Sequence, residues 1–361
     1  MQPYALVSAE SVPTLIRVDL MSRALSFAHV FSIPMEANMK PTQLMVALVA
    51  GLLFFNGGAI AQSEQAGATA PQGARNQPAQ QEAGATQQFR IRRVTPAYWR
   101  VTIDHPPFNI FGPESIPQLN SVITQIENDP ELKVVVFDSA VPGFFLTHYD
   151  FVPPLEVTTR MPPGPTGLPP LPDMLSRLSR SSVVSIASIR GRATGVGSEL
   201  SLASDMRFAS REKAVLSQFE VGAGFDPGGG PMARLPRLMG RGRALEILLS
   251  GNDINGELAE RYGYVNRSLP DAGLDNFVDT LARRIASFDK QTIGEIKHYV
   301  NIATLPPDSE VGPQWDAFIT SVQRPAAQQD IRKLMELGLQ KKPDVEIHLD
   351  RYTGKVNQPD K

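Results

Sequence analysis

The sequence predicts an α/β protein whose front half alternates short buried strands with helices and whose back half is almost entirely helical. In 98–137, a strand, an amphipathic helix and a second buried strand follow one another, which is the pattern of a crossover unit in a parallel sheet. A glycine-rich turn at 190–197 leads from another apolar strand into a helix. From residue 231 onward, apolar residues recur at helical spacing, with one short strand between the helices.

Each element follows from its own pattern. Short apolar or alternating runs predict strands, which we expect at 89–94, 98–103, 134–137, 182–189, 206–209, 214–217 and 265–269. Helical spacing predicts helices near 116–126, 171–180, 231–239, 241–250, 256–262, 271–288, 290–303, 309–322 and 325–339. Prolines exclude helix and ladder bonding, so 104–109 is expected to be a loop and 161–172 an ordered loop or flap.

The N-terminus carries the pattern of a signal peptide. Residues 44–55 form a 12-residue apolar run, which is short for a membrane-spanning helix. Met39-Lys40 precedes this run, and Ala59-Ile60-Ala61 follows it as a small-residue cleavage site. We therefore expect an exported protein, periplasmic or secreted, with no stable membrane span after cleavage and with residues 1–34 an over-extended reading of the gene. An uncleaved anchor or a buried helix is the alternative, and without a functional signal the protein would be cytoplasmic.

Composition divides the rest of the chain. Residues 62–88 are rich in Ala, Gly, Gln and Pro and cannot bury enough apolar surface to fold, so a disordered linker is expected after the signal region 1–61. The predicted folded core spans 89–285, and a C-terminal helical region spans 286–340. Residues 341–361 are expected to form a loosely held tail.

Bulk composition excludes several classes of function. The chain has 361 residues, 42% of them hydrophobic, with a net charge of −2 and no long block of like charge, so no nucleic-acid partner is expected. The absence of cysteine excludes disulfides, thiolate nucleophiles and Cys-based zinc sites. The five histidines are scattered without ligand spacing, so no metal site is expected.

The turn before Glu199 has the chemistry of a polarising site. Its glycines allow close approach of the backbone to a ligand, and the start of the helix offers unpaired N–H groups at the positive end of the helix dipole. Such donors can hold a developing oxyanion while Glu199, one turn into the helix, moves a proton. A plain glycine turn with a solvated glutamate is the alternative.

Several ordered motifs carry a family resemblance. The stretch Gly191-Arg192-Ala193-Thr194-Gly195-Val196-Gly197-Ser198-Glu199-Leu200, followed by Glu220, Gly224, Pro227, Gly228 and Gly230, resembles the crotonase superfamily of enoyl-CoA hydratases and isomerases. The family segment Ala-Phe-x-x-Gly-x-Asp lies over Phe144–Asp150 without a gap. The resemblance covers about residues 98–340.

The resemblance implies a spiral of ββα units with a helical C-terminal region that forms trimers, often paired into hexamers. It implies an acyl-CoA thioester as substrate, with no separate cofactor. The backbone N–H groups of Tyr149 and Val196 would form the oxyanion hole. Hydratases of the family use two glutamates, here Glu199 and Glu220, whereas isomerases usually retain only the second. A lyase is therefore expected first and an isomerase second, with one carboxyl protonated because two close carboxylates do not both ionise freely.

The resemblance also suggests the residues around the substrate. Those expected to bind it are Phe108, His148, Asp150, Gly195, Gly197, Pro227 and Gly228. His148 stands where the family has glycine, and a purely structural histidine is the alternative. Basic residues at Arg190, Arg192 and Lys297 are candidates for contact with the phosphates of CoA, although a solvated helix face also predicts Lys297.

Export and a CoA substrate conflict, because acyl-CoA is a cytosolic metabolite. This conflict leaves open a different thioester or carbonyl substrate, or an exported non-catalytic binding or scaffold protein on the same fold. Isomerisation and thioester hydrolysis are the other chemistries that remain open.

Overall fold

The computed structural model describes residues 87–358, and the statements below concern that part of the chain. The expected signal peptide, cleavage site and start codon lie outside the described residues, as does nearly all of the expected linker.

Two sheets form the centre of the fold. The six-stranded sheet has the order β1 (Phe89–Thr95), β2 (Tyr98–Ile103), β3 (Val134–Ser139), β5 (Val184–Ile189), β7 (Met206–Ser210) and β10 (Arg267–Leu269). Only β1 and β2 pair antiparallel in this sheet. The four-stranded sheet has the order β4 (Phe144–Leu146), β6 (Arg192–Thr194), β8 (Val215–Ser217) and β9 (Ile254–Asn255).

Successive strand pairs build a spiral. The pairs β3–β4, β5–β6 and β7–β8 each contribute one strand to the large sheet and the next to the small sheet. Helix α5 (Pro170–Arg180) follows the first pair and α6 (Val196–Ala203) follows the second. The α/β class and the spiral of ββα units are therefore confirmed.

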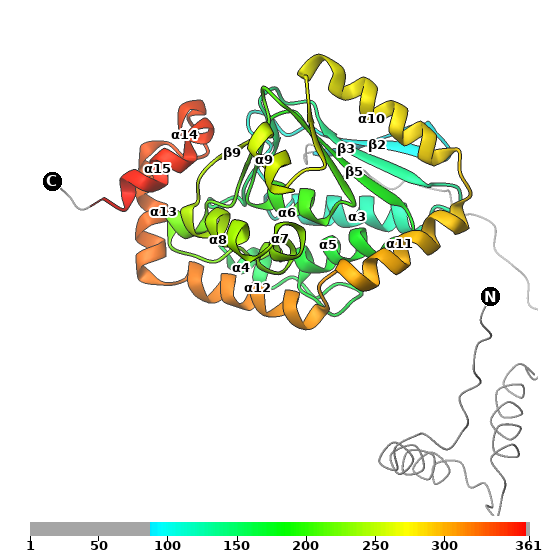
Figure 1. Ribbon diagram of the computed structural model, residues 1–361. Helices are drawn as coiled ribbons and strands as arrows, with labels where there is room; N and C mark the ends of the chain where they lie inside the picture. Colours follow the sequence, from blue (N-terminus) through cyan, green and yellow to red (C-terminus); the bar gives the residue numbers. More distant parts are fainter. Residues whose placement is uncertain (1–86, 359–361) are drawn as a thin grey trace, which may run out of the picture. The chain divides into compact units, whose positions relative to one another are not determined.

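The large sheet is buried on both faces, which explains its apolar strands. Val134 and Val136 face Leu274 and Val278 of α10 (Asp271–Ala286). Their neighbours Val135 and Phe137 face the opposite way. That second face packs on the larger core, which includes α3 (Ser115–Asn128), α5 and α6. Figure 1 shows α10 on one side of the sheet and these three helices on the other.

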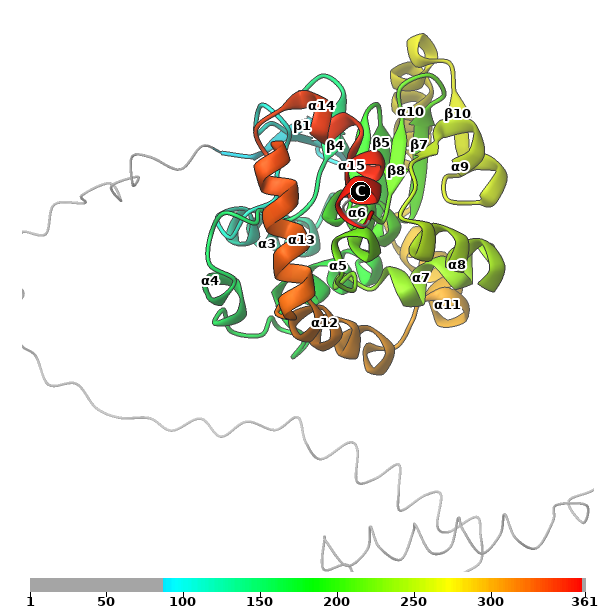
Figure 2. The ribbon, with the colours of Figure 1, turned by 90° about the vertical axis from the view of Figure 1, so that its left-hand side faces the viewer.

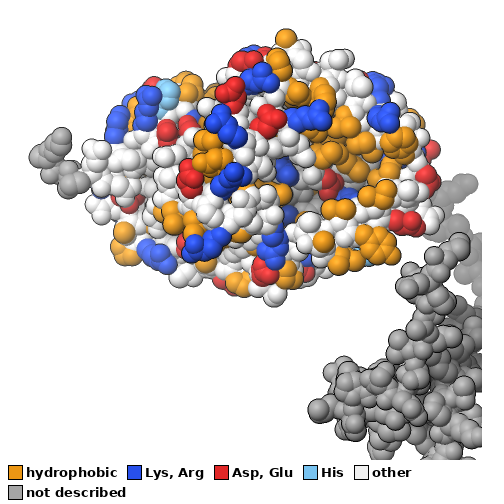
Figure 3. All heavy atoms as spheres, in the orientation of Figure 1, with side chains coloured by type: hydrophobic (Ala, Val, Ile, Leu, Met, Phe, Trp, Pro, Cys, Tyr) orange, Lys and Arg blue, Asp and Glu red, His pale blue; other side chains and the backbone are white. Residues whose placement is uncertain are grey.

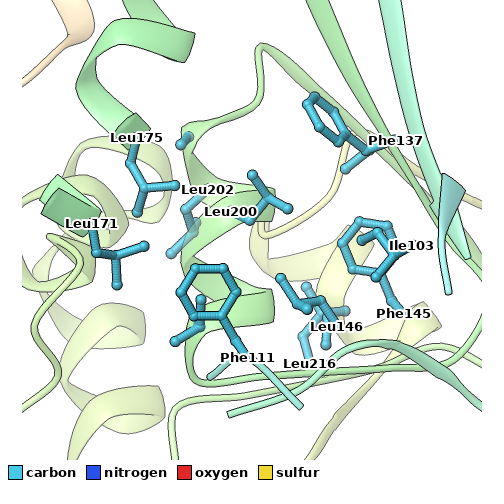
Figure 4. Packing of buried hydrophobic residues seen from close by; sticks show 14 of the residues in the cluster. Ile103, Phe111, Phe137, Phe145, Leu146, Leu171, Leu175, Leu200, Leu202 and Leu216 are labelled. Atoms are coloured by element: carbon cyan, nitrogen blue, oxygen red, sulfur yellow. The ribbon is translucent and has the colours of Figure 1, made fainter. Parts of the chain in front are cut away.

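Helix α6 lies at the centre of the larger core. Figure 4 shows Leu200 and Leu202 of this helix between Leu171 and Leu175 of α5 on one side and Phe145 and Leu146 on the other. All eight residues of α6 are buried. Surrounding packing therefore fixes the position of every side chain on this short helix, including Glu199.

The helical back half has the expected order. Helices α7 (Pro231–Met239), α8 (Arg241–Ser250) and α9 (Gly256–Tyr262) have the predicted bounds. They are followed by α10, α11 (Lys290–Thr304), α12 (Asp308–Val322) and α13 (Pro325–Leu337). Helix α12 packs against α5 and α7, so the back half returns to the core. No helix within 87–358 is both long and apolar enough to cross a membrane.

Several elements differ from the sequence-based expectation. Strands β6 and β9 have only three and two residues, too few to show a period. The short helix α4 (Glu156–Thr159) was not expected and lies just before the proline-rich run 161–172, which runs into the start of α5. The expectation of a loosely held tail after Lys341 is wrong, because 343–356 forms α14 (Pro343–Ile347) and α15 (Leu349–Val356).

The two last helices pack onto the core through buried apolar side chains. Val345, Leu349 and Val356 are buried within the main hydrophobic core. Helix α15 contacts α13 and the 3-10 helix η1 (Glu220–Ala223). Figure 2, viewed from this end, shows α13, α14 and α15 in front of the sheets.

Helix α11 presents an apolar surface to solvent. Ile296, Tyr299, Val300 and Ile302 are between 53% and 72% exposed. Figure 3 shows hydrophobic side chains gathered on the right-hand half of this face of the molecule. Such clustering of exposed apolar side chains on one helix is typical of an interaction surface.

Candidate active site

A small cavity lies where α6, η1 and the loop after β4 meet. Its volume is about 40 Å³, enough for a few water molecules. Among the described residues that line it, Glu199 and Glu220 are the only ones with a carboxylate. The remaining lining is mainly apolar and aromatic: Phe111, Ile116, His148, Tyr149, Phe151, Thr158, Leu171, Gly195, Val196, Phe219, Phe225, Pro227, Gly228, Trp315 and Phe318.

Two glycines place α6 against this cavity. Gly195 precedes the helix with φ 55°, a conformation that L side chains rarely adopt. A Cβ on Gly197 would lie 1.7 Å from the carbonyl oxygen of Leu146, so the helix packs directly on β4. Glu199 then follows one turn into the helix, and its N–H donates to the Gly195 carbonyl at 2.9 Å.

Glu199 is buried but has a donor and a cation nearby. Its Oε1 accepts a hydrogen bond from the N–H of Gly229 at 2.7 Å. A Cβ on Gly229 would lie 2.3 Å from Glu199 Oε2, so only glycine permits this approach. Burial raises the pKa of Glu199 to about 7, against the opposing effects of the Gly229 bond and the Arg234 charge. Glu199 therefore changes protonation state near neutral pH.

Glu220 is less well compensated. It begins η1, it is 6% exposed, and its Oε2 has no hydrogen-bond partner among the described residues. Burial raises its pKa well above the ordinary value, and the neighbouring Glu199 raises it further. Of the two carboxyl groups, Glu220 therefore has the stronger tendency to keep its proton.

Two backbone N–H groups on the cavity wall have no acceptor within the described part of the chain. Val196 is the first residue of α6. Tyr149 lies opposite Phe111 in a short parallel β-bridge, whose hydrogen bonds are made by His148 and Asp150. Phe111 N–H donates to the His148 carbonyl at 3.1 Å, and Asp150 N–H donates to the Phe111 carbonyl at 3.0 Å, which leaves the Tyr149 N–H between them. The positive φ lies at Gly195, not at Val196, so valine is accommodated without strain there.

The remaining expected substrate residues divide into two groups. His148, Gly195, Pro227 and Gly228 line the cavity. Phe108 packs on Phe144 with ring centroids 5.4 Å apart, Asp150 accepts from Gln340 Nε2 at 2.6 Å, and Gly197 supports α6. The second group is not brought to the cavity, and a role in binding stays a prediction for every residue in both groups.

The basic residues considered for phosphate contact are engaged elsewhere. Arg190 pairs with Asp271 and Asp275, and Arg192 pairs with Asp253. Lys297 does not lie on a solvated helix face. It is 8% exposed and pairs with Asp205 at 2.7 Å.

Sequence reasoning did not find the aromatic wall of the cavity. Phe151, Phe219, Phe225, Trp315 and Phe318 come from four separate segments and meet only in the folded chain. Trp315 and Phe318 look like ordinary core residues of a helix, and the other three lie in loops, so no local signal in the sequence distinguishes them. Among the described residues, no group of three His, Asp or Glu side chains has the arrangement of a metal site.

Comparisons with known proteins agree on one family. A family model described as enoyl-CoA hydratase/isomerase matches residues 97–336. A short-chain-enoyl-CoA hydratase from Clostridium acetobutylicum is 31% identical over 188 residues, covering 52% of this chain and 71% of that protein. The mouse mitochondrial enoyl-CoA hydratase domain-containing protein 2 is 33% identical over 163 residues, covering 45% of this chain and 53% of that protein.

Some relatives are matched over only part of their length, whereas a solved structure is matched over its whole length. The chain spans 42% of the length of a relative from Dictyostelium discoideum. A crystal structure described as an enoyl-CoA hydratase from Streptomyces avermitilis superposes with a TM-score of 0.72 at 37% identity. That match covers 77% of this chain and 100% of the other.

Proposed function

The chain belongs to the enoyl-CoA hydratase/isomerase family and has the crotonase fold, and we propose that it adds water reversibly to an enoyl thioester. The observation that carries this proposal is the pairing of two buried carboxyl groups with two unpaired backbone N–H groups around one cavity. A single carboxyl group is enough to move a proton within a substrate, whereas addition of water benefits from one base and one acid.

The backbone would stabilise the charge that develops on the substrate. We place the thioester oxygen between the N–H groups of Tyr149 and Val196, where negative charge grows as the enolate forms. The positive end of the α6 dipole points at the same place. Preorganised donors of this kind act without reorganisation cost in a site that excludes water.

The different environments of the glutamates suggest their roles. Glu199, with a pKa of about 7, is available as a carboxylate that takes a proton from water while the water oxygen bonds to the β-carbon. The electrons of the double bond move onto the thioester oxygen as an enolate. Glu220, with its raised pKa, gives its proton to the α-carbon as the enolate collapses. One water is consumed, and the two glutamates exchange protonation states.

The cavity size bears on substrate entry. A volume of about 40 Å³ accommodates the attacking water, whereas sites for small ligands measure about 300–1,000 Å³. We therefore propose that α4 and α12 move apart when an acyl chain enters, since Thr158 of α4 and Trp315 and Phe318 of α12 form part of the wall.

A hydration assay tests the proposal. Purified protein is incubated with CoA thioesters of 2-enoic acids of increasing length, and the loss of conjugated absorbance and the 3-hydroxyacyl product are measured. Glu199→Gln and Glu220→Gln should each lower kcat by about a hundredfold or more, because each removes an acid or a base. Glu336→Gln, at an exposed position on α13, is the matched control and should leave kcat unchanged.

Other products identify the alternatives. Double-bond migration would indicate an isomerase, and release of the free thiol would indicate a hydrolase. Saturable thioester binding without any product would favour the non-catalytic binding protein. Wild-type rates in both glutamine variants would refute the proposed acid and base.

We also propose export of the protein and its self-association. The apolar surface of α11 supports a homotrimer or hexamer, which light scattering on the purified protein measures. N-terminal sequencing of the protein from each cell fraction tests export and cleavage before Gln62. If the mature protein is found outside the cytoplasm, the substrate is a thioester other than a cytosolic CoA ester, and the hydration assay should then be run with non-CoA thioesters.

A further inference from the structure

His148 makes two polar contacts that the proposed reaction does not use. This residue directly precedes Tyr149 in the chain, and its side chain is 1% exposed. Ring atom Nε2 lies 3.1 Å from Glu346 Oε2, and ring atom Nδ1 lies 2.8 Å from the carbonyl oxygen of Tyr149. Phe151 and Phe219 pack against the ring, so no solvent reaches it from those sides.

These contacts determine the protonation state of the ring. A neutral imidazole carries one N–H, but here both nitrogens face acceptors, so only the doubly protonated ring donates to both. Burial alone would lower the pKa of His148, but the charge and hydrogen bond of Glu346 outweigh it, so the pKa is raised overall. For Glu346, burial raises the pKa, but the charge and hydrogen bond of His148 oppose this, and the pKa is lowered overall.

The charged groups around this pair favour the ionic form. Asp150, two residues after His148 in the chain, adds negative charge that raises the pKa of the histidine. Arg192 donates to the Ile347 carbonyl and lowers the pKa of Glu346. Glu220 lies across Gly195 from the His148 backbone. The raised pKa of Glu220 disfavours a second negative charge at this place.

The turn between α13 and α14, which contains Gln340, holds Glu346 rigidly. Glu346 is 0% exposed, and its Oε1 accepts from the N–H of Gln340 at 2.6 Å. Gln340 bonds through its side chain to the N–H of Phe151 at 3.0 Å and to Asp150 Oδ1 at 2.6 Å. The turn and the segment 148–151 are therefore joined at three places.

The same contacts fix the peptide groups on both sides of the Tyr149 N–H. The carbonyl of His148 accepts from Phe111 N–H at 3.1 Å, and the carbonyl of Tyr149 accepts from the His148 ring. With both carbonyls held, the intervening N–H has one direction, toward the cavity.

We propose that Glu346 is a positioning residue that holds His148 as an imidazolium, and that the charged ring, fixed on the Tyr149 peptide, stabilises the negative charge that develops on the substrate oxygen. This inference rests on the proposed function and goes beyond it, since it gives the C-terminal helix α14 a part in the reaction. The buried positive ring also lies beside the place where the enolate charge develops, where a low dielectric strengthens its effect.

The variant Glu346→Gln separates charge from shape. The amide oxygen still accepts from Gln340 N–H, and the amide NH₂ donates to Nε2 of a neutral His148 whose Nδ1–H donates to Tyr149. All three hydrogen bonds persist while the charge is lost. With the Glu346 charge gone, burial outweighs the smaller effect of the Asp150 charge and favours the neutral ring, so His148 is charged only at acid pH.

The first measurement is ¹⁵N NMR of histidine-labelled protein at pH 7.5. We expect an imidazolium signal for His148 in the wild type and a neutral ring in Glu346→Gln. Assignment uses His148→Gln as the reference spectrum. A neutral His148 in the wild type would overturn the inference, whatever the activity of the protein.

The second measurement is the pH dependence of hydration. At pH 7.5, Glu346→Gln should lower kcat between about 10-fold and 100-fold, less than the loss from deleting an oxyanion donor outright, with KM changed by less than about twofold. The ratio of variant to wild-type kcat should rise as the pH falls, because the ring regains its proton. Glu336→Gln should show neither effect.

The outcomes distinguish this inference from the proposed function. An active wild type with an unchanged pH profile in Glu346→Gln, or with only a lower Tm, would refute the positioning role alone. A wild type that hydrates no enoyl thioester would refute the proposed function, and the positioning role would fall with it.

Discussion

Replacing Glu199 by Gln should make the protein more stable at alkaline pH while it removes the proposed base. Glu199 is 2% exposed, and its pKa is raised from 4.5 to about 7 by burial. In the unfolded chain the carboxyl ionises near pH 4.5, whereas in the folded chain it resists ionisation until about pH 7. The folded state therefore binds the proton more tightly, and stability falls as pH rises through this window.

The size of the effect follows from the pKa difference. A shift from 4.5 to about 7 corresponds to about 3 kcal/mol of unfolding free energy, present below pH 4.5 and lost by about pH 8. Glutamine is neutral throughout and loses none of it. Its side-chain oxygen still accepts from the Gly229 N–H, so the variant keeps the bond at 2.7 Å.

Urea denaturation at pH 5, 7 and 8.5 measures the difference. The unfolding free energy of Glu199→Gln minus that of the wild type should grow by about 2–3 kcal/mol across the series. Glu220 is present in both proteins, so the difference reports Glu199 and its coupling to Glu220. Glu336→Gln, exposed on α13, should show a constant difference. A constant difference for Glu199→Gln as well would refute the assignment of a buried, proton-retaining carboxyl group.

Two further substitutions test the packing that supports the site. Gly197→Ala places a Cβ 1.7 Å from the Leu146 carbonyl oxygen and should lower the unfolding free energy by more than about 4 kcal/mol. Its control is Gly242→Ala, where no atom lies within 4 Å of the added Cβ, so the Tm should change little or rise. Leu349→Ala, at a position in α15 that is 1% exposed, should lower the unfolding free energy by about 2–5 kcal/mol. Its control Leu337→Ala, at a position 37% exposed, should lower it much less. Equal decreases in Tm for the two variants would mean that α15 does not pack on the core.

Much of the fold was predictable because its elements carry their patterns locally. The helices from Pro231 to Tyr262 show helical spacing between glycines, and their predicted bounds match the structure. The strand Val134–Ser139 is apolar because both faces are buried, and a continuous run marks such a strand. The family assignment rests on residues clustered in a few short stretches, which is why it too was accessible from the sequence.

The parts that were missed depend on contacts between distant segments. Strand β6 holds Arg192, a residue unexpected in a buried strand, because Asp253 and the Ile347 carbonyl satisfy its charge and donors. In the last helices, buried apolar residues alternate with charged ones after Pro343, so the segment has the composition of a tail. The segment differs from a loose tail only because Val345 and Leu349 are buried in the main core.

The candidate site, too, has properties that could be predicted from the sequence and others that could not. The family resemblance identified both Glu199 and Glu220 as candidates, and both line the cavity in the structure. Their different pKa values were not predictable, since these depend on the Gly229 N–H, on Arg234 and on depth of burial.

The bond between His148 and Glu346 joins residues 198 positions apart, and this separation bears on when the site is completed during synthesis. A ribosome releases the chain from its N-terminus, so both glutamates and both cavity N–H groups emerge long before Glu346. A nascent chain that has folded its sheets still lacks the last hydrogen bonds to the segment 148–151. Proteolytic loss of α14 and α15 would return a finished molecule to that state, with the reacting groups in place and His148 without its carboxylate partner.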